Sequence, residues 1–354
     1  MSNFSGTYDP SDVTFLLAPV EIPVITVAEK EKLLRNGQRH YSEVLSAETP
    51  PSPEYLAAYR AALSANSVRL ARDIVRLAGA LAERPTSQAG MALVSFARAG
   101  TPIGVLLSRA LRRVGLKLFH YSISIVRDRG IDEAALGYIL ERHEPRDLVF
   151  IDGWTGKGAI SRELRRSQFL NDLEVEPFLA VVADPAGQAD LASTGEDYLI
   201  PSGILNGIIS GLVSRSVIPA GLRAGQFHTC RVLHELGPHD ISRRFVDEID
   251  KIALGLLKEQ PACWPPAERR ERAAACTRLV LSLQKRYELA DVNRIKPGLA
   301  EATRALLRRQ PRELLIAGPQ DSSLEHLLLL CRERAVLVRE MKSLEGYRAV
   351  AILE

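Results

Sequence analysis

The stretch between residues 91 and 184 most constrains the fold, because short apolar runs alternate there with segments of helical pattern. Met91–Ala97 and Asp147–Asp152 are apolar at most positions, as strands covered on both faces are. A helix is expected after each of them, over Pro102–Val114 and over Ala159–Ser167. This order of elements predicts an α/β domain around a parallel sheet, whose ligands bind at the carboxyl ends of its strands.

The loop after the second of these strands has the composition of a phosphate-binding loop. Three glycines let backbone N–H groups approach an anion closely, and the helix that follows adds positive partial charge. A threonine and a lysine supply further donors, although the spacing is not that of a Walker A motif. The residues predicted to contribute are Asp152, Gly153, Trp154, Thr155, Gly156, Lys157, Gly158 and Ala159.

Three other loops follow predicted strands and lie at the same expected edge of the sheet. The first, with Arg98, Ala99, Gly100 and Thr101, offers a backbone turn and a guanidinium group for an anion. Arg127 and Arg129 flank an aspartate before a helix, a pattern that fits either a mobile basic loop or a solvated turn. Asp184 ends a third buried strand, in a turn that either completes the anion site or has only a structural role.

Composition places the chain among soluble proteins of a reducing compartment. It has 354 residues with 46 Lys and Arg against 43 Asp and Glu, and a formal net charge of +3. So mild an excess does not by itself indicate a nucleic-acid partner. The four cysteines show no C-x-x-C pair, and neither a leader pattern nor an 18-residue apolar run is visible. We therefore expect a cytoplasmic protein without a membrane partner.

Composition and periodicity divide the chain into four regions. We expect a mostly helical accessory region over residues 1–88 and the α/β core over residues 89–240. A helical region follows over 241–311, and Pro311 separates it from a small α/β unit over 312–354.

The loop pair around Arg98 and Asp152 resembles that of the type I phosphoribosyltransferases. The resemblance implies a pyrophosphate loop at 98–101, a carboxylate at Asp152 facing the ribose hydroxyls, and a 5-phosphate loop at 155–159. That family usually has two adjacent acids, whereas this chain has Ile151 before Asp152.

Four segments extend the resemblance to the phosphoribosyltransferase-like proteins of tellurite-resistance (Ter) operons, a family also labelled "cysteine protease StiP". They are SFARAGTPIG, FHYSISIVRDRGID, VFIDGWTGKGAI and SGILNGIISGLVSRSVI. Members typically end in a Pelota-like RNA-binding domain, which residues 313–354 resemble. This resemblance implies a stress-response enzyme of nucleoside-like metabolite biosynthesis, with RNA as a partner of the C-terminal domain.

The first expectation for function is therefore a phosphoribosyltransferase, a glycosyltransferase that uses phosphoribosyl pyrophosphate (PRPP) or a related sugar phosphate or nucleotide. Such an enzyme would use Mg²⁺, with Asp152 as the metal ligand, and would release pyrophosphate. Arg98, Arg127 and Arg129 would stabilise the leaving group. A homodimer is a further expectation.

Two alternatives remain open. One is a cysteine hydrolase or protease that uses Cys230, with His228 and His234 nearby in the sequence. The other is a non-catalytic regulator that binds a nucleotide or RNA. The last arginine-rich stretch fits either a contact with nucleic acid or a second protomer, or a solvated face. Its residues are Arg294, Lys296, Arg304, Arg308 and Arg309.

Overall fold

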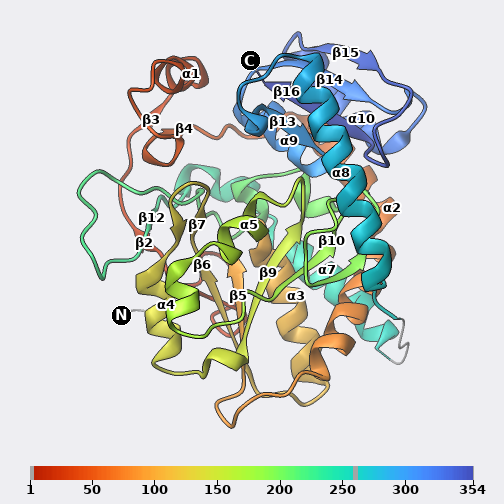
Figure 1. Ribbon diagram of the computed structural model, residues 1–354. Coiled ribbons are helices and arrows are strands. Elements are labelled where there is room, and N and C mark those ends of the chain that lie inside the picture. The colour runs from red at the N-terminus through yellow and green to blue at the C-terminus, as the bar shows by residue number, and fades with distance from the viewer. Residues whose placement is uncertain (1–3, 258–261, 354) are drawn as a thin grey trace.

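The computed structural model describes residues 4–257 and 262–353. At its centre is a six-stranded sheet with the order β1-β6-β5-β9-β10-β11, in which all neighbours run parallel (Figure 1). The expectation of an α/β protein with a parallel central sheet is confirmed. The strands are β1 (Thr14–Phe15), β5 (Met91–Phe96), β6 (Leu118–Ile123), β9 (Leu148–Trp154), β10 (Leu179–Ala183) and β11 (Leu191–Thr194).

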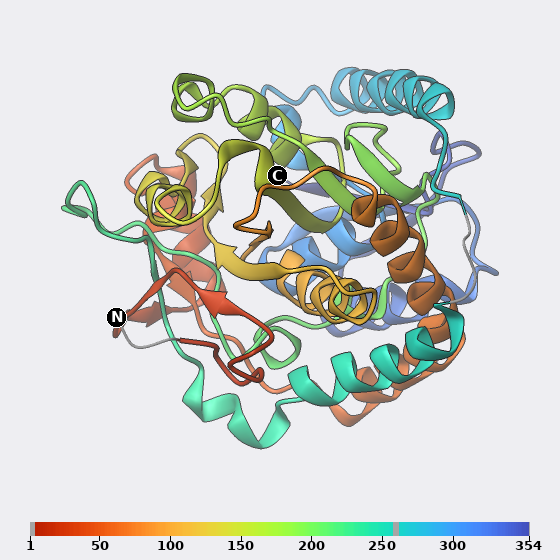
Figure 2. The same cartoon turned by 90° about the horizontal axis from the view of Figure 1, so that it is seen from below.

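Helices cover both faces of this sheet (Figure 2). The side chains of β5 alternate between two apolar clusters: Leu93 packs with helices α2, α3 and α7, and Val94 packs with α4, α5 and α6. Because successive strand side chains point to opposite faces, both faces must be covered to bury them. The helices are α2 (Pro53–Ala82), α3 (Gly100–Arg113), α7 (Ser242–Leu256), α4 (Glu133–Leu140), α5 (Ala159–Arg165) and α6 (Gln168–Asp172).

The N-terminal part is less helical than the sequence predicted for residues 1–88. Besides α2 it has a second helix, α1 (Val27–Arg35), and four short strands. One of these, β1, extends the central sheet by pairing with β6, a non-local contact that helical periodicity does not show. The remaining short strands form the pairs β2 (Ala18–Pro19) with β12 (Thr229–Cys230), β3 (Val24–Ile25) with β4 (Leu45–Ser46), and β7 (Ile125–Val126) with β8 (Gly130–Ile131).

A separate four-stranded sheet forms the C-terminal domain (residues 266–353), with the order β13-β16-β14-β15. It begins before residue 312, where the sequence placed the boundary, because β13 pairs antiparallel with β16. Helix α8 is the first element of this domain and packs on its sheet (Figure 1). Its elements are α8 (Pro266–Arg286), β13 (Ile295–Pro297), α9 (Leu299–Arg308), β14 (Pro311–Ile316), α10 (Glu325–Glu333), β15 (Leu337–Glu340) and β16 (Ala349–Leu353).

Short 3₁₀ helices occupy several connections. They span Tyr41–Glu43, Pro145–Asp147, Pro201–Gly203, Gly207–Ile209, His234–His239, Val292–Arg294 and Ser322–Leu324. Across residues 4–257 and 262–353, we find no helix that combines the length and the apolar character needed to cross a bilayer.

Candidate functional site

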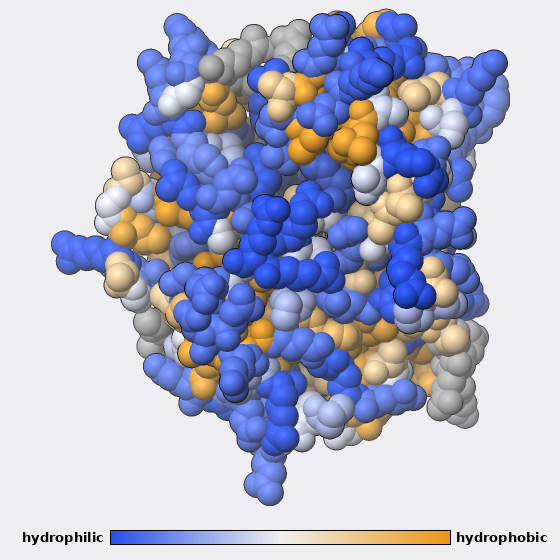
Figure 3. Space-filling view, in the orientation of Figure 1, coloured by the Kyte–Doolittle hydropathy of each residue, from blue (hydrophilic) through white to orange (hydrophobic). Residues whose placement is uncertain are grey.

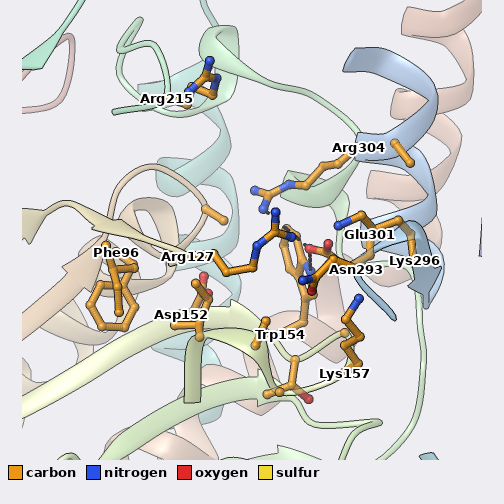
Figure 4. A pocket seen from close by; sticks show the side chains of 18 of the residues that line it. Phe96, Arg127, Asp152, Trp154, Lys157, Arg215, Asn293, Lys296, Glu301 and Arg304 are labelled. Atoms are coloured by element: carbon orange, nitrogen blue, oxygen red, sulfur yellow. Dashed lines mark hydrogen bonds and ion pairs between the residues drawn. The ribbon is translucent and has the colours of Figure 1, made fainter. Parts of the chain in front are cut away.

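A cavity of about 310 Å³ lies between the central sheet and the C-terminal domain. Residues 96–99, Asp152 and residues 154–161, at the carboxyl ends of β5 and β9, form one wall, and residues from 293 to 309 contribute the opposite wall. Arg127 and Arg304 point into the cavity from opposite sides (Figure 4). Hydrophilic side chains also gather across the middle of this face of the molecule (Figure 3). The parallel sheet thus presents its carboxyl edge to a cavity, as expected for this architecture.

The cavity is strongly cationic. Nine lysines and arginines line it but only two carboxylates, those of Asp152 and Glu301. Burial lowers the pKa of both Arg304 and Arg308, because desolvation and neighbouring guanidinium groups disfavour their charged forms. An anion entering the cavity would relieve this repulsion. The cationic residues are Lys30, Arg98, Arg127, Lys157, Arg215, Lys296, Arg304, Arg308 and Arg309.

Arg304 is oriented toward the cavity but incompletely satisfied. Its guanidinium carbon lies 4.5 Å from the ring centroid of Trp154, and its Nη1 lies 3.9 Å from Glu301. The indole N–H of Trp154 donates to the same carboxylate over 3.4 Å. The buried Nε of Arg304 has no hydrogen-bond partner among the described residues. An oriented guanidinium with unused donors is suited to bind an oxyanion.

Asp152 lies half-buried at the base of the cavity, as Figure 4 shows. Burial raises its pKa to about 6, although Arg304 and the Gly153 N–H oppose this shift. One oxygen, Oδ1, accepts the Gly153 N–H over 2.8 Å. The carboxylate is therefore positioned to accept hydrogen bonds from a ligand on its cavity side.

The residues present do not fit the expected Mg²⁺ site. Within residues 4–257 and 262–353, no three side chains of His, Cys, Asp or Glu come together as a metal site. Asp152 instead lies in a cavity where cations outnumber carboxylates nine to two. Such a charge balance opposes a divalent cation and favours an anion.

The loop after β9 differs from its expected role in two side chains. The hydroxyl of Thr155 donates to Asp184, and its backbone N–H bonds to Ala183. The ammonium group of Lys157 donates to the carbonyl oxygens of Val292 at 2.7 Å and Ile295 at 2.9 Å. Both side chains were expected to bind a phosphate, whereas here they fix the loop and join it to the C-terminal domain.

Arg98 also has protein partners where a pyrophosphate was expected. It is 4% exposed, pairs with Glu48 and donates to the Val213 carbonyl over 2.9 Å. Glu48 comes from the segment before α2, which the sequence did not link to this loop.

Five other expected site residues do not line the cavity. Gly100 and Thr101 are the first residues of α3, and the Thr101 hydroxyl lies 2.8 Å from that of Ser122. Arg129 is exposed and pairs with Glu43 at 3.3 Å. Asp184 accepts the N–H groups of residues 188 and 189, which fixes a buried turn. Gly153 is buried within β9. By contrast, Ala99, Trp154, Gly156, Gly158 and Ala159 line the cavity, and their part in binding a substrate stays a prediction.

Cys230 lies on β12 with no exposed surface. Burial raises the pKa of its thiol to about 12. The ring Nδ1 of His228 lies 2.8 Å from the hydroxyl of Ser124, so that nitrogen already has a hydrogen-bond partner. In this conformation the thiol is buried and protonated, so it lacks the access and the thiolate form that a nucleophile needs.

Several cavity residues were missed, or left open, by the sequence analysis. Glu48 and Glu301 come from segments that carry no recognisable motif, and Arg215 lies in SGILNGIISGLVSRSVI, which carried the family resemblance but suggested no site residue. Arg304 and Arg308 lie four residues apart on α9, one helical turn, and this spacing was the available signal that they share a face.

Comparisons with known proteins match this chain to two family models, to one curated relative and to a solved structure. The family model described as "Tellurite-like stress resistance cysteine protease StiP" matches residues 6–250, and the model of the "PELOTA RNA binding domain" matches residues 274–354. "Cysteine protease StiP" of Acinetobacter baylyi is 40% identical, covering 99% of this chain and 94% of its own. Among solved structures, an amino transferase from Eubacterium rectale is 12% identical, with a TM-score of 0.25 over 95% of this chain and 84% of its own.

These comparisons correct the expected activity. The family and the relative are named as cysteine proteases, so the expectation of a phosphoribosyltransferase, and of any glycosyltransferase, is wrong. The comparisons show the expected tellurite-resistance family and Pelota domain, but they do not show the type I phosphoribosyltransferase-like assignment. The chain belongs to the family described as tellurite-like stress resistance cysteine protease StiP.

Proposed function

We propose that the cavity between the central sheet and the C-terminal domain binds the phosphate group of a nucleotide ligand, and that this ligand is an RNA end. The observation that carries the proposal is the excess of basic side chains over carboxylates among the described residues that line the cavity, with Arg304 oriented into it and its buried Nε unpaired. Guanidinium groups match phosphate oxygens in geometry as well as in charge.

The C-terminal domain supports RNA as the source of the phosphate. Its residues match the PELOTA RNA binding domain, and it supplies Lys296, Arg304 and Arg308 to the cavity. The volume of about 310 Å³ is close to the lower limit of typical ligand sites, so it suits a single nucleotide better than a folded RNA. Trp154, beneath Arg304, offers an aromatic surface near the phosphate position.

Calorimetric titration of a short oligoribonucleotide, with and without a 5′-phosphate, tests this proposal. We expect the phosphorylated form to bind more tightly, and Arg304→Gln to weaken its binding about tenfold or more. Arg312→Gln removes the same charge from an exposed position outside the cavity and should change little. Equal binding of the two oligonucleotides, or equal effects of the two variants, would contradict the proposal.

A second candidate is thiol-dependent proteolysis, which the names of the family and of the Acinetobacter relative support. Cys230 is the candidate nucleophile from the sequence. Because its thiol is buried and protonated in this conformation, proteolysis at Cys230 requires a rearrangement that exposes the thiol to a base. Hydrolysis of casein by the wild type that is lost in Cys230→Ser and kept in Cys263→Ser would support this candidate. Absence of hydrolysis, or hydrolysis that persists in Cys230→Ser, would refute it.

The type I phosphoribosyltransferase-like fold and the homodimer stay predictions from the sequence. Neither is needed for the phosphate site, since all nine cations come from one chain.

A further inference from the structure

A buried ion pair separates the cavity from a neighbouring one. Glu48 pairs with Arg98, and their side chains are 15% and 3% exposed. The second oxygen of Glu48 accepts the Gly207 N–H over 3.0 Å. The carboxylate is thus held by a guanidinium and a backbone N–H, the same donors that bind oxyanions in proteins.

Positive charge exceeds negative charge around this carboxylate. Arg215, Arg304 and Arg308 also interact electrostatically with Glu48. Burial alone would raise the pKa of Glu48, but Arg98, Arg308 and the Gly207 N–H together hold it below its ordinary value. The buried Nε of Arg98 has no partner among the described residues. Even with Glu301 and Asp152 near Arg304, four guanidinium groups face three carboxylates here, so positive charge remains in excess.

The pair forms part of the wall between two cavities. Arg98 lines the phosphate cavity, and Glu48 lines a second cavity of about 240 Å³. Arg215 and Arg308 line both. If the Glu48 carboxylate moved away, the space between Arg98 and the Gly207 N–H would open beside the proposed phosphate ligand.

The backbone around Glu48 is free to move without loss of regular structure. Residues 47–52 belong to no helix or strand, and β4 before them is two residues long. Ala47 and Thr49 are exposed on either side of Glu48. Ala47, whose N–H donates to Ile25 over 3.4 Å, and Ser52, the N-cap of α2, hold the two ends of this segment. Withdrawal of residues 48–51 between them would break the contacts of Glu48 and leave these end contacts in place.

We propose that the position of the Glu48 carboxylate is a second anion-binding site, which a phosphate group of the ligand takes when Glu48 withdraws. This proposal rests on the phosphate-binding function proposed for the same cavity. Arg98 and the Gly207 N–H then bind phosphate oxygens in place of carboxylate oxygens, and Glu48 competes with the ligand in its absence.

Calorimetric titration of inorganic phosphate into three proteins tests the proposal. Glu48→Gln keeps the side-chain size but removes the competing charge. We expect it to bind phosphate about tenfold more tightly than the wild type, a change of about 1.4 kcal/mol. Glu43→Gln changes a nearby glutamate that pairs with the exposed Arg129, and this variant should bind phosphate as the wild type does. The stability lost in Glu48→Gln should also return in phosphate but not in chloride of equal ionic strength.

A measurement on the wild type does not depend on the folding of any variant. Phosphate should accelerate hydrogen exchange in residues 45–52, because the segment loses its anchor when Glu48 withdraws. Phosphate binding by the wild type with unchanged affinity in Glu48→Gln, or with slowed exchange in this segment, would overturn the second site and leave the proposed function intact. No phosphate binding by any of the proteins would overturn both.

Discussion

The hydroxyl of Tyr347 donates a 2.8 Å hydrogen bond to the carbonyl oxygen of Gly156. The C-terminal domain thereby holds the glycine-rich loop by its backbone, next to the contacts from Lys157. The loop that the sequence assigned to phosphate binding thus also serves as the docking surface for the second domain. Because both walls of the cavity meet here, changes in the loop should affect docking and ligand binding together.

Gly156→Ala should weaken this docking. An added Cβ would lie 2.5 Å from Cγ of Glu301 and 3.3 Å from the carbonyl oxygen of Pro297, so the Glu301 side chain or α9 itself must shift. We expect a loss of about 1–3 kcal/mol in the free energy of unfolding, measured by denaturant titration. Gly153→Ala is the matched control, since its Cβ would meet nothing closer than 3.6 Å. Equal stability of the two variants would contradict the tight contact.

Lys157→Met should remove the link to β13 while keeping the length of the side chain. The carbonyl oxygens of Val292 and Ile295 would lose a donor, which costs about 1–3 kcal/mol when such groups remain buried. Lys251→Met, at an exposed position of α7, should have little effect. Urea unfolding of both variants checks this prediction. A Lys157→Met protein as stable as Lys251→Met would show that the link contributes nothing.

The central sheet was predictable because a strand that is buried on both faces appears in the sequence as a short run of apolar residues. The end of β9 was not: the strand continues from Asp152 to Trp154, where Ala183 of β10 pairs with Trp154. This pairing shifts the turn to residues 155–158 and explains why Gly153 is a strand residue. Strand pairing is a non-local interaction, so a one-dimensional pattern does not fix where it stops.

Asp197 should make stability depend on pH. Its carboxylate accepts the N–H groups of Leu299 at 2.9 Å and Arg348 at 2.8 Å, which joins the core to the C-terminal domain. Burial raises its pKa from 3.8 to about 6, so the folded state retains a proton that the unfolded state releases in this interval. The contribution of Asp197 to the free energy of unfolding therefore falls as pH rises from about 4 to 6.

Denaturant titrations of the wild type and Asp197→Asn at both ends of this interval isolate that contribution. The change between the two pH values should differ between the proteins by about 1–3 kcal/mol, with the larger fall in the wild type. Parallel pH profiles would show that Asp197 does not titrate in this range.

Thiol reactivity should follow burial. Burial raises the pKa of Cys230 to about 12, whereas Cys263 is partly exposed. In the native protein iodoacetamide should therefore modify Cys263 before Cys230, as followed by peptide mass mapping. In urea the two rates should converge. Faster labelling of native Cys230 would reveal a reactive thiol and favour the protease candidate.

The cationic wall on α9 shows why half of the candidate site was not predictable. As a sequence pattern, the basic stretch that includes Arg304 and Arg308 fits a solvated helix face as well as it fits a ligand-binding face. In the structure Leu299, Ala302 and Leu306 are buried, and the arginines line the cavity. Which face of a helix meets another domain depends on tertiary docking, and Asn206, which accepts from Arg308 over 2.7 Å, lies 102 residues away in the sequence.

An oxyanion bound in the cavity would be seen most directly by locating an electron-dense phosphate analogue in crystals. Crystals of the wild type and of Arg304→Gln soaked in tungstate would be measured at the tungsten absorption edge. We predict an anomalous peak in the wild-type cavity between Arg304 and Arg127, and a weaker peak or none there in the variant. Tungstate bound only at surface arginines, with the cavity empty in both crystals, would contradict the account.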